Sequence, residues 1–510
     1  MNTLELNGQA LSLAQLRQVW EEPISIGLGK QARARVQDAQ AFVNQSLESS
    51  RPFYGINTGF GKLAHVRIER SKLDRLQENL IRSHAVGVGK PLSEDVVRLS
   101  MILKVNALAK GYSGVRPELV DLLCAFVNTG VFPSVPSQGS VGASGDLAPL
   151  AHIAKALIGE GTVSRDGKTS SIAEVMKESG LNPIQLAPKE GLALLNGTQV
   201  STALALIALF KAERILSASL IAGAMSAEAT KSSDTPFDER IHQVAGHPGQ
   251  QDVSALLQRL MSDSEIRASH VSCNRVQDPY SIRCQPQVVG ACLDVFRHAA
   301  DVLRVEANSV TDNPIVFTET KAILSSGNFH AEPIAMVSDY MAISIAEIGA
   351  LSERRIALLM DSNMSQLPEF LVKETGVNSG FMMAQVTAAS LASENKVLAH
   401  PASVDSIPTS ANQEDHVSMA TFAARRLHDM LDNTSRIVGI ELIAAAQGIE
   451  FRRPLKTSEP LEESLKQVRG LSEPYIQDRS LANEIEAVAQ SVNDGAFFDF
   501  AQSMMPSVNV

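Results

Sequence analysis

The sequence predicts a mainly α protein, in which a loop-rich N-terminal region is followed by a bundle of long helices that packs into an oligomeric helical core. Hydrophobic residues make up 44% of the 510 residues, yet aromatic residues make up only 5% and tryptophan occurs once. The core must therefore be built from Ala, Leu, Ile and Val, as in closely packed helices. Long apolar segments without interior proline are the second observation, and glycine-rich stretches before residue 200 are the third.

The N-terminal region, residues 1–197, begins with a short alternating segment at residues 4–6. Asn7-Gly8 predicts a hairpin-type turn, and Ser12 predicts the start of a helix that ends near Glu21. Loops interrupt the rest of the region. Four stretches are rich in glycine and indicate unusual backbone turns, at residues 54–61, 87–89, 111–114 and 139–145. Loops of this kind often carry functional residues.

The C-terminal region, residues 198–510, contains long segments rich in Ala, Leu, Ile and Met. We expect helices at residues 198–230, 286–310, 332–360 and 381–400. Pro286 and Pro333 stand at helix starts, where proline is tolerated. Segment 332–360 is apolar around most of its circumference, so it should be buried on all sides. One chain cannot surround several such helices, and we expect an obligate oligomer. From about residue 451 the sequence is polar, which indicates a peripheral helical tail.

Charge and hydropathy exclude two kinds of partner. Lys and Arg number 45 against 56 Asp and Glu, so the formal net charge is -11, the wrong sign for binding nucleic acid over a broad surface. The N-terminus lacks the pattern of a signal peptide, and apolar stretches such as residues 203–210 are shorter than the roughly 18 residues of a membrane span. We therefore expect no nucleic acid and no membrane as partner.

The cysteine pattern favours a reducing compartment. The four cysteines are Cys124, Cys273, Cys284 and Cys292. They show neither Cys-x-x-Cys spacing nor the density of a secreted disulfide scaffold. We expect free thiols and a cytoplasmic protein.

The most informative motif surrounds Ser144. Residues 139–150 read Gly-Ser-Val-Gly-Ala-Ser-Gly-Asp-Leu-Ala-Pro-Leu, which places a serine among very small residues. On its own this pattern is typical of a loop that leads into a helix capped by Asp146. A serine hydrolase is disfavoured, because Asp146 stands where a Gly-x-Ser-x-Gly elbow has its second glycine. The motif instead resembles the signature of the aromatic amino acid ammonia-lyases.

This resemblance covers nearly the whole chain and implies a cofactor. Matching motifs follow in the expected order at residues 54–61, 196–198, 277–283 and 412–416. In this family an Ala-Ser-Gly triplet cyclises and dehydrates into 4-methylidene-imidazol-5-one (MIO). The resemblance implies that MIO forms autocatalytically from Ala143, Ser144 and Gly145, where small side chains do not crowd the ring closure. It implies no external cofactor and no metal ligands, although a divalent ion at His84 stays open.

The match is closest to the members of this family that act on histidine. It implies a carbon–nitrogen lyase that eliminates ammonia from L-histidine and gives trans-urocanate, the first step of histidine degradation. It also implies a homotetramer whose active sites are shared between subunits. Elimination needs an electron sink, because the amine is a poor leaving group and the β-hydrogen is barely acidic. A sink made from the chain itself fits a sequence without a visible cofactor-binding signature.

For the substrate carboxylate, the resemblance assigns Arg283. The local sequence agrees, because Asp278 is a good N-cap and Pro279 suits the first helical position. Tyr280 and Arg283 then lie three residues apart on one helix face, and the positive helix end attracts an anion. Without the resemblance, a solvated Arg283 at an ordinary helix start would be the simpler interpretation.

For the base, the resemblance offers Tyr54 and Tyr280. A free tyrosine has a pKa near 10, so positive charge or hydrogen bonds must lower the pKa of whichever residue removes the proton. We favour Tyr54 as the base and Tyr280 as the partner that positions the intermediate, and the alternative assignment stays open. Asn196 and Gln277 are expected to supply uncharged hydrogen bonds, and Phe329 is expected to line the pocket.

Two residues bear on the choice of substrate. His84 offers a polar side chain that suits an imidazole or a phenol equally. Glu414 decides more, because a carboxylate can hold an imidazole N–H but would be a buried, unpaired anion against a phenyl ring. A tyrosine ammonia-lyase or an aminomutase with the same electrophile is the near alternative. A catalytically silent helical scaffold of the same fold is the more distant one.

Overall fold

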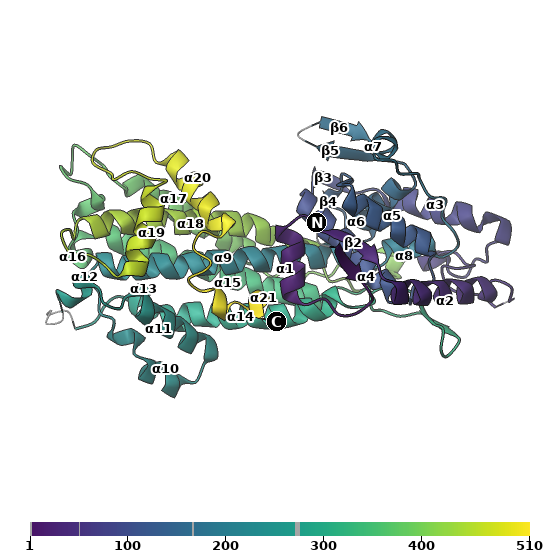
Figure 1. The fold of residues 1–510 in the computed structure, drawn as a ribbon, viewed down its shortest axis with the longest axis horizontal. Coiled ribbons are helices and arrows are strands. Elements are labelled where there is room, and N and C mark those ends of the chain that lie inside the picture. Colours follow the sequence, from purple (N-terminus) through teal and green to yellow (C-terminus); the bar gives the residue numbers. More distant parts are fainter. Residues whose placement is uncertain (1–2, 50, 166–167, 271–275, 510) are drawn as a thin grey trace. The chain divides into compact units, whose positions relative to one another are not determined.

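The computed structural model describes residues 3–49, 51–165, 168–270 and 276–509, and it is predominantly helical, as predicted (Figure 1). The chain forms two compact units. Unit 1 takes in Met1–Ile207, Asp301–Asp339 and Pro401–Arg425, and unit 2 takes in Ala208–Ala300, Tyr340–His400 and Arg426–Val510. Each unit therefore draws on three separate stretches of the chain.

Unit 1 combines short helices with paired strands. Its helices are α1 (Leu13–Glu21), α2 (Lys30–Ser46), α3 (Leu73–His84), α4 (Glu94–Ala109), α5 (Pro117–Asn128), α6 (Leu147–Leu157), α7 (Ile172–Glu178) and α8 (Glu190–Leu195), with 3-10 turns η1 (Gly61–Leu63), η2 (Arg70–Lys72) and η5 (Ser410–Asn412). One pair of strands is parallel, β1 (Thr3–Leu6) with β2 (Ser25–Leu28). Three pairs are antiparallel, β3 (Val88–Pro91) with β4 (Pro136–Gln138), β5 (Thr162–Arg165) with β6 (Lys168–Ser171), and β7 (Ile315–Phe317) with β8 (Ala322–Leu324).

The N-terminal elements correct one prediction. Ser12 caps α1 as expected, with its hydroxyl accepting from the Gln15 backbone and the Gln15 side chain accepting from Ser12 in return. The turn at Asn7-Gly8 does not close a hairpin, so that prediction is wrong. Gly8, at φ 72°, leads toward α1, and β1 pairs in parallel with β2 after this helix. Parallel strands need such a crossover, whereas a two-residue turn joins only antiparallel strands.

The long helices are confirmed. They are α9 (Gln199–Ala229), α14 (Gln285–Ala307), α15 (Glu332–Met360) and α17 (Met382–Leu398). A further long helix, α18 (Ala420–Glu450), was not predicted. The boundary between the units falls inside α9, α14, α15 and α18, so each of these helices contributes residues to both units.

Unit 2 completes the helical part. Its remaining elements are α10 (Glu239–Ala245), α11 (Pro248–Leu260), α12 (Glu265–Ala268), α13 (Tyr280–Arg283), α16 (Ser362–Ser365), α19 (Glu459–Arg469), α20 (Ala482–Asp494) and α21 (Pro506–Asn509), with η3 (Thr235–Phe237), η4 (Glu369–Leu371) and η6 (Gln502–Met504). Inside this unit Arg355 of α15 pairs with Glu441 of α18, with 2.8 Å between Nη2 and Oε2, and both side chains are buried. This ion pair explains how the charged side chain of Arg355 can be buried in α15.

Helix α15 is the one described helix that could span a membrane by length and composition. Most of its apolar window is buried within the protein, and core helices of soluble proteins pass the same test. This helix alone is therefore weak evidence for a membrane span. One of its faces remains uncovered in the single chain, because Met336, Tyr340 and Ile343 are exposed at helical spacing.

The described cysteines are free thiols, as expected. They are Cys124, Cys284 and Cys292. Burial raises the pKa of Cys124 and of Cys292 to about 12 in each case, so both are poor nucleophiles. Cys273 lies outside the described residues.

Candidate active site

A cavity of about 730 Å³ in unit 1 brings together five of the predicted site residues. They are Tyr54, His84, Ser144, Asn196 and Glu414. Most of the remaining wall is apolar, with side chains from Phe60, Leu63, Val66, Ile68, Leu76, Leu80, Leu147, Leu192 and Leu195. A smaller cavity of about 280 Å³ shares His84, Ser144 and Glu414 with it and is also lined by Ala143 and Gly145. An apolar pocket with a few converging polar groups is a typical small-molecule site.

The backbone around Ser144 requires glycine at the next position. Gly145 has φ 77°, a left-handed conformation that other residues adopt at a cost. A Cβ atom placed on Gly145 would lie 2.1 Å from the carbonyl oxygen of Gly197. Ala143 is buried at 5% exposure. Position 145 therefore accepts no side chain, and Ala143 on the other side of Ser144 is buried, which is compatible with a cyclised Ala-Ser-Gly group.

Asp146, which directly follows the triplet, is fixed by several hydrogen bonds. Its buried carboxylate accepts hydrogen bonds from the Ser201 backbone (2.7 Å), the Ser201 hydroxyl (3.0 Å) and the Thr421 hydroxyl (2.7 Å). Its backbone N–H donates to the Gly197 carbonyl at 2.8 Å. Burial raises the pKa of Asp146 even though these hydrogen bonds oppose the shift. Asp146 occupies the N-cap position of α6 as predicted, but its carboxylate makes no capping hydrogen bond to the helix, because Ser201 and Thr421 use it instead.

Glu414 lines the same cavity as Ser144 and is hydrogen-bonded to it. The Ser144 hydroxyl donates to Glu414 Oε1 at 2.8 Å, and the Thr409 hydroxyl donates to Glu414 Oε2 at 2.7 Å. The backbones of Thr409 and Glu414 also pair, with N–O distances of 2.8 and 3.3 Å. Between them Ser410, Ala411 and Asn412 all have positive φ, at 52°, 52° and 63°. Three consecutive left-handed residues other than glycine are strained, and strain of this kind concentrates at functional sites.

Asn196 is held in place by hydrogen bonds, one of them from the buried Lys104. Its side-chain amide donates to the Asn313 carbonyl at 2.8 Å. Its own carbonyl accepts a hydrogen bond from Lys104 Nζ at 2.6 Å, and the same ammonium reaches the Ala193 carbonyl at 3.2 Å. Desolvation lowers the pKa of Lys104 to about 7, although Asp312 opposes the shift. Asp312 itself pairs with a second buried lysine, Lys189, at 2.7 Å.

Tyr54 and His84 are oriented by local contacts. The Tyr54 hydroxyl accepts a hydrogen bond from the Gly61 backbone at 3.1 Å, and its ring meets Phe60 edge to face. His84 ends α3, where its Nδ1 lies 2.8 Å from the Leu80 carbonyl. Nδ1 therefore carries a proton, and in the neutral ring Nε2 keeps its lone pair.

The remaining predicted site residues are not among those that line the two cavities. Phe329 is half-buried in unit 1, whereas Gln277, Tyr280 and Arg283 belong to unit 2. There the guanidinium of Arg283 lies 4.4 Å from the centre of the Tyr280 ring, and its Nη2 donates to Gln277 Oε1 at 3.2 Å. Gln277 and Arg283 line a separate cavity of about 590 Å³.

The helix start before Arg283 differs from the prediction by one residue. Pro279, not Asp278, occupies the N-cap position of α13. The Asp278 carboxylate instead accepts from the Ser233 backbone at 2.7 Å. The Asp278 carboxylate therefore binds a residue distant in the sequence, Ser233, and does not cap the helix that follows it.

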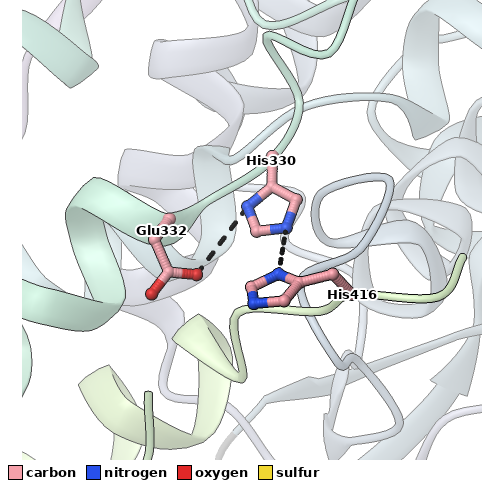
Figure 2. A group of neighbouring side chains, drawn as sticks. All are labelled: His330, Glu332 and His416. Atoms are coloured by element: carbon pink, nitrogen blue, oxygen red, sulfur yellow. Dashed lines mark hydrogen bonds and ion pairs between the residues drawn. The ribbon is translucent and has the colours of Figure 1, made fainter. Parts of the chain in front are cut away.

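One cluster was not predicted from the sequence. His330, Glu332 and His416 converge in unit 1, although His416 is far from the other two along the chain (Figure 2). The spacing of His330 and Glu332, two residues apart, was the available signal. Nothing in the sequence joined that pair to His416.

Three comparisons with known proteins point to the same family. The family model described as aromatic amino acid lyase matches residues 11–470. The histidine ammonia-lyase of Desulfotalea psychrophila is 54% identical over 507 residues, which is 99% of each chain. The crystal structure of histidine ammonia-lyase from Trypanosoma cruzi has a TM-score of 0.91 and 42% identity, over 99% of this chain and 96% of that one. Tyrosine aminomutase from Streptomyces globisporus has a TM-score of 0.92 and 36% identity, over 99% of both chains.

Proposed function

The chain belongs to the aromatic amino acid lyase family, and we propose that it eliminates ammonia from L-histidine to give trans-urocanate, with an MIO group formed from its own residues. The single observation that carries this proposal is the pair formed by Ser144 and Glu414, 2.8 Å apart in one cavity. It joins the serine from which MIO forms to a carboxylate suited to an imidazole. A relative named histidine ammonia-lyase, matched over 99% of its length, supports the same substrate.

MIO would be held by the residues that already surround the triplet. Ring closure joins the amide nitrogen of Gly145 to the carbonyl carbon of Ala143 with loss of one water, and Ser144 loses its hydroxyl as a second water. The left-handed Gly145 and the buried Ala143 leave room for this closure and for no larger side chain. When formed, the group supplies an electrophilic methylidene carbon that makes the α-amine of the substrate a better leaving group.

Glu414 is the proposed partner of the imidazole ring. Dehydration of Ser144 removes the hydroxyl that donates to Glu414 Oε1, while Thr409 still holds Oε2. Oε1 is then ready to accept a hydrogen bond from the imidazole N–H of histidine. A phenyl ring offers no donor, so a phenylalanine substrate would leave this carboxylate unpaired. Histidine is therefore favoured over phenylalanine at this position.

Tyr54 is the favoured base because it lines the same cavity as Ser144. It would take the β-proton of the substrate, and Asn196, which lines the same cavity, would offer a hydrogen bond from its side-chain amide. His84 would meet the substrate ring with the lone pair of Nε2. Tyr280 keeps its proposed role as the partner that positions the intermediate.

The carboxylate of the substrate requires a cation, and the cavity that contains Ser144 is lined by one lysine, Lys62, which cannot form the two-pronged contact that an arginine makes with a carboxylate. Among the described residues that line the two cavities of unit 1 there is no arginine. We assign the carboxylate to Arg283, with Gln277 beside it, and propose that both come from a neighbouring subunit of a homotetramer. The exposed apolar face of α15, at Met336, Tyr340 and Ile343, supports such assembly. Free thiols and the bacterial relatives fit a cytoplasmic location.

The proposal is tested by substrate turnover and by intact mass. Purified protein is incubated separately with histidine, tyrosine and phenylalanine while ultraviolet absorbance is followed, and we expect product to form fastest from histidine. A tyrosine ammonia-lyase or an aminomutase with the same electrophile, the alternative that the likeness to tyrosine aminomutase keeps in view, would instead favour tyrosine. The mature chain should be lighter than its sequence by two water molecules, and active protein of unmodified mass would refute the mechanism.

The serine itself provides the sharpest variant. We expect Ser144→Ala to assemble as wild type, because Ser144 contributes no buried apolar packing, yet to lose about 1,000-fold or more of its turnover without the electron sink. Its mass should show no loss of water. A Ser144→Ala protein that keeps wild-type turnover would place the sink elsewhere in the chain. A protein that assembles with the mature mass but turns over no amino acid would fit a catalytically silent scaffold.

A further inference from the structure

A cluster of two histidines and one glutamate lies in unit 1 outside the residues that line its cavities. His330 stands just before α15, Glu332 is the first residue of α15, and His416 lies between η5 and α18. Figure 2 shows the His330 ring between the other two side chains, with its Nδ1 toward Glu332 and its Nε2 toward His416. None of these residues has a role in the proposed reaction.

The donor atoms are close enough to share one ion. One ligand atom from each residue can be chosen so that all three lie within 4.8 Å of one another. His416 Nδ1 is 3.3 Å from His330 Nε2, and His330 Nδ1 is 3.9 Å from Glu332 Oε2. Two ligands that each lie about 2.1 Å from an ion are at most about 4.2 Å apart. One ion uses only one nitrogen of His330, so a small rotation of the side chains would complete the site.

The carboxylate provides a second, independent observation. Glu332 Oε2 is buried and has no hydrogen-bond partner among the described residues. The 3.9 Å to His330 is too long for a hydrogen bond. A carboxylate oxygen that is shielded from water and lacks a donor is destabilising. A cation placed between this oxygen and the imidazoles would relieve that cost.

We propose that His330, Glu332 and His416 form a binding site for a divalent transition-metal ion of the Zn²⁺ class. Two imidazole nitrogens with one carboxylate oxygen are a ligand set that Zn²⁺ accepts, with water in the fourth position. Imidazole also suits Ni²⁺ and Cu²⁺, whereas Mg²⁺ and Ca²⁺ prefer oxygen ligands throughout. The side chains of His330 and Glu332 are 29% and 32% exposed, so an ion can reach them from solvent.

The ion would join two segments that carry proposed site residues. His330 directly follows Phe329, and His416 lies two residues after Glu414. The stacking of the two imidazoles, 5.4 Å between ring centres, already brings these segments together. Binding therefore stabilises the segment that carries Glu414 against the start of α15. The site is separate from the chemistry at Ser144, so its binding of metal does not depend on the proposed reaction.

Direct binding of Zn²⁺ is the test. The full-length chain, without an affinity tag, is stripped with a chelator, and Zn²⁺ alone is titrated by calorimetry in the absence of amino acid. We expect one high-affinity ion per chain in the wild type. His416→Gln and Glu332→Gln should each weaken binding by at least tenfold. His65→Gln, which removes another imidazole of unit 1 outside the cluster, should bind as wild type does.

Co²⁺ provides a measurement that needs no variant. Bound by this ligand set in four-coordinate geometry, it should give an intense visible absorption band that Zn²⁺ abolishes by competition. Absence of the band in the wild type would overturn the proposal. Equal Zn²⁺ affinity in wild type, His416→Gln and Glu332→Gln would overturn it too, because the ion would then be bound elsewhere. Thermal unfolding without metal establishes whether each variant is folded, and the Co²⁺ result decides if one is not.

Discussion

Two carboxylates lie near Ser144, and their surroundings separate their roles. Asp146 is fully enclosed, and Ser201 and Thr421 occupy both of its oxygens. Glu414 lines the cavity, and among the described residues its Oε1 accepts a hydrogen bond from the hydroxyl of Ser144, the group that the proposed MIO formation would remove. Asp146 therefore positions the backbone, whereas Glu414 is available to a ligand. Both acids stand in sequence motifs, but only their contacts distinguish them.

Replacing Glu414 with glutamine should lower histidine turnover without preventing assembly. Glu414→Gln keeps the size of the side chain and removes its charge, so the imidazole loses an anionic partner, and we expect kcat to fall by roughly 100- to 10,000-fold. Turnover, intact mass and oligomeric state are measured on the same preparation, which separates failed MIO formation from failed chemistry. Glu463→Gln, an exposed change on α19, is the control. Wild-type activity in Glu414→Gln would remove the main reason for choosing histidine.

Lys104 should make stability depend on pH. Its pKa falls from 10.5 in the unfolded chain to about 7 in the folded protein, so between these values the unfolded state binds more protons. Stability then rises with pH from about 7 upward, and this contribution is lost as pH falls through 7. Lys189, Asp312 and Asp146 face the same ammonium and shape this titration.

The variant that tests this is Lys104→Met, which keeps the apolar stem and removes the amine. We expect the Tm of wild type, relative to the variant, to be higher at pH 9 than at pH 6.5. Both are measured at one protein concentration, because the Tm of an oligomer depends on concentration. A constant difference between the two proteins at both pH values would show that Lys104 does not titrate in this range.

At the scale of elements, the close approach of two chain segments explains the glycine pattern. The backbone of Gly145 runs alongside that of Gly197, and the Asp146 N–H bonds to the Gly197 carbonyl. Glycine is required here by contact as well as by φ, because a Cβ on Gly145 would overlap Gly197. Gly180 has a similar φ of 69° but no atom within 4 Å of an added Cβ. Substitution at Gly180 therefore tests the effect of backbone conformation alone, whereas substitution at Gly145 tests conformation and packing together.

We expect Gly145→Ala to be much more damaging than Gly180→Ala. Alanine at position 180 should lower the free energy of unfolding by about 1–2 kcal/mol, because alanine is strained in the left-handed conformation but meets no other atom there. The alanine at 145 adds the overlap with Gly197, so the protein should unfold at a lower temperature and the chain should keep its unmodified mass. Differential scanning fluorimetry and intact mass measure the two effects. Equal Tm values with mature mass in both variants would contradict the packing argument.

The predicted helices agree with the structure to within a few residues, whereas helix α18 and the pairing of the strands were not predicted. Segment 332–360 coincides with α15, because a long, mostly apolar segment with proline only in its first turn leaves few alternatives. Helix α18 escaped prediction because charged residues such as Arg425, Arg426 and Asp429 interrupt its first half. The partner of β1 could not be inferred either, since β2 lies beyond α1 and strand pairing depends on tertiary contacts.

At the scale of the whole molecule, the candidate site could be predicted only in part. The motifs around Ser144 and Glu414 identified residues that converge in one cavity of unit 1. Lys104 was missed because a lysine in an apolar helix gives no sign of where its ammonium points. Arg283 and Gln277, two further predicted site residues, contact each other in unit 2 and do not line the cavities of unit 1 that contain Ser144. If neighbouring subunits share the site, as proposed, the pairing of Arg283 with a cavity depends on the assembly, and no sequence motif encodes that.

Mixing two inactive variants tests whether the sites are shared between subunits. Ser144→Ala lacks the proposed electron sink of unit 1, and Arg283→Gln lacks the proposed carboxylate cation of unit 2, so each homo-oligomer should be nearly inactive. If a site combines Ser144 of one subunit with Arg283 of another, hetero-oligomers obtained by co-expression should regain turnover, because some sites receive both intact residues. If each chain completes its own site, every site carries one defect and the mixture should stay inactive. Co-purification through two different tags, followed by kcat for histidine, distinguishes these outcomes.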